Sequence, residues 1–279
     1  MNKSIKLIAA IALCVMLFAS CKKEPTPTPE PAIETGLEGQ FMPERKIVSM
    51  ESFDIIGEDS LRPYIKNSYE WNGDLLTRMT QQQNGYDYYI ESFQYDSLNR
   101  IKRSVMNFNV EPNPRVDTYD YIYEGKVMVK MNGYHENGEL FEDVTIIREN
   151  GKPTSFRHAK YDEPTTNADH DFVWGGDNII QTAVNETGMP LPYDYTYDDK
   201  ISPLKGFYTS NFFYDPEVLY SANNIVSSTM EQSLGSMTLT FIQTNEYEYD
   251  DKGYPVKNTC TMDNGITVHK RVIFYTYME

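Results

Sequence analysis

Aromatic and polar positions alternate along most of the chain, in a pattern that recurs roughly every 25 residues. Each copy ends an alternating run with an aromatic side chain, passes through an acidic or Asn/Gly turn, and restarts with an apolar residue. Two copies, at residues 146–148 and 220–222, lack an aromatic residue at the position just before the turn. The residues just before the turns are Trp71, Tyr95, Tyr123, Arg148, Trp174, Tyr197, Ala222 and Tyr249. Such a period predicts stacked, equivalent units.

Each copy is expected to be a β-hairpin. Its two aromatic residues, such as Tyr121 and Tyr123, lie two positions apart and therefore share one face of a strand. Turn residues such as Asn72 and Gly73 tolerate the positive φ of tight hairpins. Eight hairpins give about sixteen strands, and a leading strand at residues 46–54 adds another. Because open sheets this wide are rare, we predict an all-β antiparallel meander, curled into a barrel-like or half-open sheet.

The pattern breaks at residues 202–219. This segment contains Pro203, Gly206 and Pro216 and does not alternate cleanly. It also concentrates aromatic side chains that need burial: Phe207, Tyr208, Phe212, Phe213 and Tyr214. We expect a long loop or short helix that plugs or caps the sheet.

The strands expected at residues 88–95 and 100–108 do not have the uninterrupted apolar face that a membrane-spanning barrel requires. In residues 100–108, Arg100 and Lys102 lie on one face of the strand, and Arg103 lies on the other. The sheet is therefore predicted not to span a membrane.

The N-terminus is typical of an export signal. Lys3 and Lys6 precede an apolar run at residues 7–18, and small residues lead to Cys21, which resembles a bacterial lipobox. We predict a lipoprotein signal peptide at residues 1–20, lipidation of Cys21, a Pro/Thr-rich tether at residues 21–45 and one β-repeat domain at residues 46–279. The expected location is the outer membrane, on its periplasmic or cell-surface side.

Composition limits the partners. The formal net charge is −16, which repels phosphate backbones, so no nucleic-acid partner is expected. After the signal is removed and Cys21 is lipidated, Cys260 is the one cysteine left, so no intrachain disulfide can form. Cys260 is expected to be a buried apolar residue.

The segment Asn245 to Val256, with its Tyr-Asp turn followed by Gly and an apolar residue, resembles YD (RHS-like) repeats. Together with the lipobox and the degenerate copies over residues 46–279, the chain resembles a Bacteroidetes lipoprotein family of unknown function with a porin-like fold. The resemblance implies an extracytoplasmic curved sheet, and it implies no reaction.

Candidate chemistry is sparse. His170 is flanked by Asp169 and Asp171, but in a strand these carboxylates face away from the histidine, so no metal site and no cofactor are expected. The usual nucleophile, zinc and phosphate-binding motifs are absent from the sequence. With 41 acidic residues, a carboxylate pair for glycoside hydrolysis can arise in many places. An enzyme is therefore less favoured than a binding protein.

Aromatic residues outside the repeat are the better candidates for ligand contact, because residues that recur in every unit are explained by sheet packing. These candidates are Tyr193, Phe207, Tyr208, Phe212, Phe213 and Tyr214. We predict a binding or scaffold module for a glycan, peptide or partner protein. The alternatives are a glycosidase-like hydrolase with paired carboxylates on the concave face, and a purely structural sheet.

Overall fold

The fold is taken from a computed structural model of the chain. It describes residues 38–41, 43–56, 60–109, 114–162, 168–186, 189–209, 215–234 and 237–279. Residues 35–279 form one compact unit. The predicted signal peptide, the lipidation site Cys21 and most of the tether lie outside the described residues.

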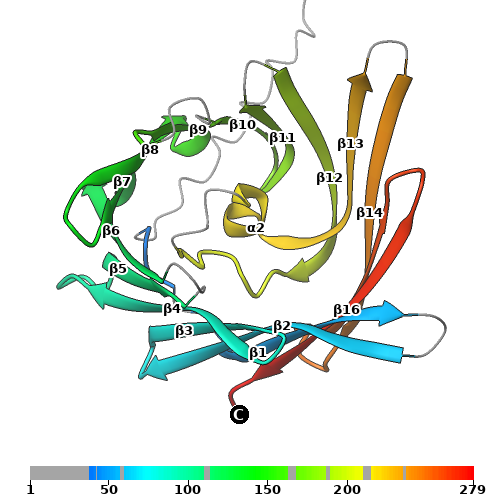
Figure 1. The fold of residues 1–279 in the computed structure, drawn as a ribbon, viewed down its shortest axis with the longest axis horizontal. Helices are drawn as coiled ribbons and strands as arrows, with labels where there is room; N and C mark the ends of the chain where they lie inside the picture. Colours follow the sequence, from blue (N-terminus) through cyan, green and yellow to red (C-terminus); the bar gives the residue numbers. More distant parts are fainter. Residues whose placement is uncertain are drawn as a thin grey trace, which may run out of the picture. The chain divides into compact units, whose positions relative to one another are not determined.

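The described residues form sixteen strands in one closed antiparallel barrel (Figure 1). Each strand pairs with its neighbours in sequence, and β1 closes the ring against β16 through pairs such as Met50 with Tyr275. The strands are β1 (Ile47–Ile56), β2 (Ser60–Asn72), β3 (Leu75–Gln83), β4 (Tyr86–Tyr95), β5 (Ile101–Phe108), β6 (Arg115–Glu124), β7 (Val127–His135), β8 (Leu140–Glu149), β9 (Lys152–Lys160), β10 (Ala168–Gly175), β11 (Asn178–Glu186), β12 (Met189–Ile201), β13 (Asn223–Leu234), β14 (Met237–Tyr249), β15 (Pro255–Asp263) and β16 (Val268–Tyr277). The predicted meander is confirmed, and its barrel is closed.

Two details of the repeat differ from the prediction. The copies at Tyr197 and Ala222 belong to one connection, from β12 to β13, which carries residues 202–222 as an insertion. The leading strand is one of the sixteen and does not add to them. Seven pairs of strands follow one another along the chain, from β2 with β3 to β14 with β15, and β1 with β16 forms the eighth pair at the closure. The eighth pre-turn position is therefore Tyr277, at the end of β16.

The pre-turn side chains join neighbouring hairpins. Each even-numbered strand ends beside the start of the preceding odd-numbered strand, and the two are covalently linked only at their other ends. This end leads into a tight turn, except at β12, where the insertion follows, and at β16, the last strand. There its aromatic tip donates a hydrogen bond of 2.5 to 2.9 Å to a backbone carbonyl of that preceding strand. The pairs are Trp71 to Ile47, Tyr95 to Leu76, Tyr123 to Ile101, Trp174 to Pro153, Tyr197 to Ile179 and Tyr277 to Pro255.

The two remaining positions are variants of the same arrangement. On β8, Arg148 donates to the carbonyl of Met128 on β7 and also pairs with the carboxylate of Glu38. On β14, Tyr249 donates to the carboxylate of Asp198. Arg148 therefore replaces the aromatic residue while keeping the donor.

The insertion fills the barrel at its tight-turn end, as the sequence predicted. The ring of Phe207 packs against Tyr69 of β2, with centroids 5.4 Å apart, and against Phe41 of the N-terminal segment at 4.8 Å. Phe41 also contacts Trp71, 5.6 Å away. The packed unit thus includes N-terminal residues that the sequence analysis assigned to the tether.

The short helix α2 (Pro216–Tyr220) lies inside the ring of strands (Figure 1). Tyr220 packs its ring on Phe156 of β9 and Trp174 of β10. Ser221 then accepts a hydrogen bond from the backbone N–H of Ile179 on β11. Residues 38–41, 202–209 and 215–222, called the plug below, are therefore held from several sides of the barrel. No helix among the described residues is long and apolar enough to cross a membrane.

We predict that Tyr95→Phe lowers the free energy of unfolding by about 1 kcal/mol, because the Leu76 carbonyl loses its partly buried donor. Tyr86, whose side chain is 80% exposed on β4, provides the matched control Tyr86→Phe. Equilibrium urea unfolding measures both variants. Equal stability of the two variants would show that the repeated hydrogen bond does not stabilise the barrel.

Candidate functional site

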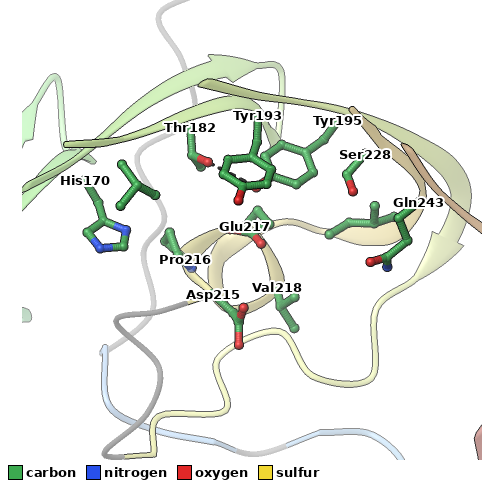
Figure 2. Close-up of a pocket in the computed structure, with 12 residues that line it drawn as sticks. His170, Thr182, Tyr193, Tyr195, Asp215, Pro216, Glu217, Val218, Ser228 and Gln243 are labelled. Atoms are coloured by element: carbon green, nitrogen blue, oxygen red, sulfur yellow. Dashed lines mark hydrogen bonds between the residues drawn. The ribbon is translucent and has the colours of Figure 1, made fainter. Parts of the chain in front are cut away.

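A cavity of about 320 Å³ lies in the barrel lumen, between α2 and the inner faces of β10 to β14. Figure 2 shows side chains from the strands and from the plug converging on it. Its lining consists of His170, Thr182, Val184, Tyr193, Tyr195, Asp215, Pro216, Glu217, Val218, Ile225, Ser228 and Gln243. The plug thus forms the floor of the cavity, and the strands form its wall.

The alternation of the strands supplies the wall. Tyr193 and Tyr195 on β12 lie two residues apart and both face the lumen, with their ring planes 14° apart and their centroids separated by 6.4 Å. Tyr193 pairs with Met230 and Tyr195 pairs with Ser228 on β13. The Tyr195 hydroxyl lies 3.0 Å from the hydroxyl of Thr182 on β11. These residues make an aromatic wall with polar tips.

Two carboxyl groups enter the cavity from the plug. Glu217 on α2 is only 9% exposed, and the loss of hydration, together with the nearby charge of Asp215, raises its pKa to about 8. A hydrogen bond from Tyr195 only partly offsets this rise. Asp215 is accessible to water, yet protein surrounds it inside the barrel, and this desolvation raises its pKa as well. At pH 7 the cavity therefore holds a mostly protonated Glu217.

His170 on β10 borders the same cavity. It is 4% exposed, and its Nδ1 atom has no hydrogen-bond partner. Burial, together with the nearby His158, lowers its pKa to about 4, so the ring is neutral at pH 7. Asp169 and Asp171 lie on the outward face, where both pair with Arg157, as the strand alternation predicted.

A second cavity of about 240 Å³ shares lining residues with the first and extends to the end of the barrel where β15 and β16 are joined. The two cavities share Tyr193, Ser228 and Gln243. Apolar side chains contribute much of the second lining, which includes Met230, Phe241, Ile242 and Met262. The lumen therefore changes from a polar, acidic floor to a more apolar upper wall.

The adjoining wall, formed by β6 to β9, contains acid–histidine pairs. The Glu142 carboxylate lies 2.8 Å from Nε2 of buried His158, and Asp117 lies 3.1 Å from Nδ1 of His135. The histidine nitrogens in these pairs have a carboxylate partner, in contrast to Nδ1 of His170. Among the described residues, no group of three or more His, Cys, Asp or Glu side chains is arranged to hold a metal ion.

The structure separates the aromatic residues that the sequence proposed as ligand contacts. Tyr193 lines both cavities. Phe207 packs in the plug, and Tyr208 is buried there against Tyr220, with centroids 6.3 Å apart. Phe212, Phe213 and Tyr214 lie outside the described residues.

Sequence reasoning missed the polar members of the site. The repeat assigns Thr182, Tyr195 and Ser228 to ordinary strands, and only barrel closure brings their inner faces against the plug. One feature of the sequence could have pointed to the two acids. Asp215 and Glu217 lie at the end of residues 202–219, close in sequence to aromatic residues that require burial.

We predict that the pH dependence of stability reports the state of Glu217. Its folded pKa of about 8 exceeds the ordinary value of 4.5, so the folded protein keeps a proton that the unfolded chain loses, and stability falls as pH rises through this window. His170 has the opposite effect, but only below its ordinary value of 6.5. Between pH 6.5 and 8, wild type should lose about 1.5 kcal/mol relative to Glu217→Gln.

Chemical unfolding at several pH values measures this difference. The control Glu246→Gln alters an exposed glutamate on β14 and should follow the wild type. Parallel curves for wild type and Glu217→Gln would contradict a raised Glu217 pKa.

Comparison with known proteins addresses the fold. No protein-family model matches the sequence, and a search of curated proteins gives no match. The structure is similar to that of a porin-like protein from Bacteroides uniformis ATCC 8492, with a TM-score of 0.56 and 14% identity over 86% of this chain and 100% of that one.

Weaker similarity extends to a porin-like protein from Bacteroides vulgatus ATCC 8482, with a TM-score of 0.38 and 12% identity over 84% of this chain and 99% of that one. It also extends to TcdB2-TccC3 without its hypervariable C-terminal region, with a TM-score of 0.26 and 9% identity over 75% of this chain and 15% of that one. Only the first similarity has a TM-score above 0.5, and at 14% identity it concerns the fold alone. This chain has a porin-like β-barrel fold.

Proposed function

We propose that the protein is an extracytoplasmic, lipid-anchored binding module that holds a small ligand, or a protruding group of a glycan, peptide or partner protein, in the barrel lumen. The observation that carries the proposal is the lumen cavity itself. It combines an aromatic wall, several polar side chains and a buried histidine whose Nδ1 has no partner. Buried polar atoms are ordinarily hydrogen-bonded, so this one is a natural contact for a ligand.

The size and lining of the cavity suit such a ligand. A volume of about 320 Å³ falls within the range of small-molecule sites, which are concave and carry a few convergent polar groups on apolar walls. The faces of Tyr193 and Tyr195 can pack on a sugar ring or a side chain. Thr182, Ser228 and Gln243 then offer hydrogen bonds from three different strands.

Ion pairs on the outward face of the barrel favour a binding protein over a membrane pore that passes solutes. Asp120 lies between Tyr119 and Tyr121, whose buried rings face inward, and its outward carboxylate pairs with Arg103 at 2.5 Å. Similar ion pairs occur on other strands: Glu51 with Lys66, Lys130 with Asp143, Arg157 with Asp171, and Glu248 with Lys257. An arginine or lysine facing lipid at mid-membrane costs about 2–4 kcal/mol, so these pairs support a barrel that does not span a membrane.

A second candidate function, glycoside hydrolysis, is favoured by one observation. Asp215 and Glu217 line the same cavity, and the raised pKa of Glu217 suits a general acid. Mass spectrometry of glycans incubated with the protein distinguishes the two functions, because binding leaves the glycan intact and hydrolysis shortens it.

We predict that filling the lumen abolishes binding. Glycan and peptide arrays probed with the purified full chain should identify ligands, and Ser228→Trp should weaken their binding at least tenfold by occupying both cavities. Thr229→Trp is the matched control, because Thr229 is the next residue on β13 and faces away from the lumen.

Thermal unfolding confirms that both variants are folded. Equal affinities of the two variants would place the ligand elsewhere. If no ligand were found on either array, the proposed binding function would fail.

We also predict that Cys21→Ala releases the protein from the membrane fraction, because the lipid attached to this cysteine is the proposed anchor. Fractionation of cells that express the wild type and the variant provides the measurement. Unchanged membrane association of the variant would contradict the anchor.

A further inference from the structure

We propose that the lumen site recognises a cationic group, an ammonium carried on an apolar arm, with the charge held between Glu217, Asp215 and the rings of Tyr193 and Tyr195. This inference rests on the proposed function and names the chemistry of its ligand. It is drawn from the lining of the two cavities and from the unpartnered atom of His170.

The first argument is the charge of the lining. Among the described residues that line the two cavities there are three carboxylic acids, two histidines and no lysine or arginine. Glu217 and Asp215 both line the floor, and no basic side chain lines the cavity with them to neutralise them. A ligand cation would supply the missing counter-charge, and the formal net charge of −16 attracts cations toward the protein.

The second argument is the aromatic wall. Figure 2 shows the rings of Tyr193 and Tyr195, which come from the strands, next to the Glu217 side chain, which comes from α2. Aromatic faces attract ammonium groups through their electron-rich rings, and this attraction is largest where water is excluded. Carboxyl groups and tyrosine rings together form the kind of surface that recognises an ammonium ion.

The third argument is His170. Its ring is neutral at pH 7, so it does not repel a cation, and Nδ1 remains without a partner inside the protein. A neutral imidazole nitrogen that carries no proton accepts a hydrogen bond from an N–H group. An ammonium has several such donors and can satisfy His170 and a carboxylate together.

The second cavity gives room for the apolar arm. It opens directly from the acidic floor past Tyr193 and Ser228, and Met230, Phe241 and Met262 contribute to its wall. A ligand with an ammonium at one end and an apolar group at the other matches this sequence of environments.

Binding of a cation should be linked to release of a proton. The titratable groups that face Glu217 are Asp215 on the plug, His170 on β10, and Tyr193, Tyr195 and Tyr197 on β12, the last of which donates its hydroxyl proton to the Ile179 carbonyl. The side chains that β11, β13 and β14 contribute to the cavity do not titrate: Thr182, Val184, Ile225, Ser228 and Gln243. A bound cation favours ionised Glu217 and lowers its pKa, so affinity rises with pH until Glu217 is ionised in the free protein.

The test is isothermal titration calorimetry of the full chain with 2-phenylethylamine, 2-phenylethanol and 3-phenylpropionate. These probes share an apolar arm and differ in charge. We expect the amine to bind at least tenfold more tightly than the other two at pH 8. Its affinity should rise about tenfold from pH 6 to pH 7. Comparison of phosphate and MOPS buffers at pH 7 should reveal release of most of one proton.

Two isosteric variants locate the effect. Glu217→Gln should weaken amine binding at least tenfold and abolish the proton release, whereas Asp215→Asn should weaken binding and keep the release. Glu246→Gln, which alters an exposed glutamate away from the lumen, should bind as the wild type does. If Glu217→Gln does not fold, the probe comparison and the buffer dependence of the wild type still decide the question.

The outcomes separate this inference from the proposed function. Equal binding of the alcohol or the carboxylate would overturn the cation preference and leave a lumen ligand site standing. Failure of all three probes, with a glycan or peptide still bound, would also overturn it. Failure of every probe and of both arrays would overturn both proposals.

Discussion

The barrel depends on one repeated hydrogen bond, which a side chain near the end of an even-numbered strand donates to a carbonyl of the preceding strand; Tyr249, which donates to Asp198, is the exception. At the end of the barrel where β2 turns into β3, no turn connects β2 to β1 or β4 to β3. The side chains of Trp71 and Tyr95 connect these strand pairs there by hydrogen bonds, and their equivalents do the same around the barrel. Tyr277 makes the same bond at the end of the chain, next to the closure with β1. The arrangement tolerates Arg148 because what recurs is a long side chain with a donor at its tip.

The plug fills one end of the barrel and leaves a cavity in the rest of the lumen. Closed barrels of this size have a lumen too wide for their own side chains to fill. Residues 38–41 and the insertion between β12 and β13 occupy one end with aromatic contacts, and the remaining space lies above α2. The floor is thus made by the segment that breaks the repeat, and it brings Glu217 and Asp215 into a lumen otherwise lined by strands.

The repeat, the strand count, the meander and the plug were predictable from sequence, because alternation and turn residues are local signals. The assignment of Tyr197 and Ala222 to separate hairpins was wrong, since spacing alone cannot distinguish a short insertion from another unit. The polar site was hidden for a different reason. Thr182, Ser228 and Gln243 resemble any other lumen-facing position until closure brings them against the plug, and the pKa of Glu217 depends on burial that no local pattern encodes.

The central claim is that the lumen holds a desolvated acid beside aromatic and unpartnered polar groups, ready for a ligand. The most direct measurement is the pKa of Glu217, by NMR titration of the protein labelled with ¹³C at the glutamate carboxyl, with the signal assigned by its absence in Glu217→Gln. The account predicts a midpoint near pH 8, well above the ordinary 4.5. A midpoint at the ordinary value would mean that Glu217 is hydrated like a surface carboxylate, and it would contradict the account.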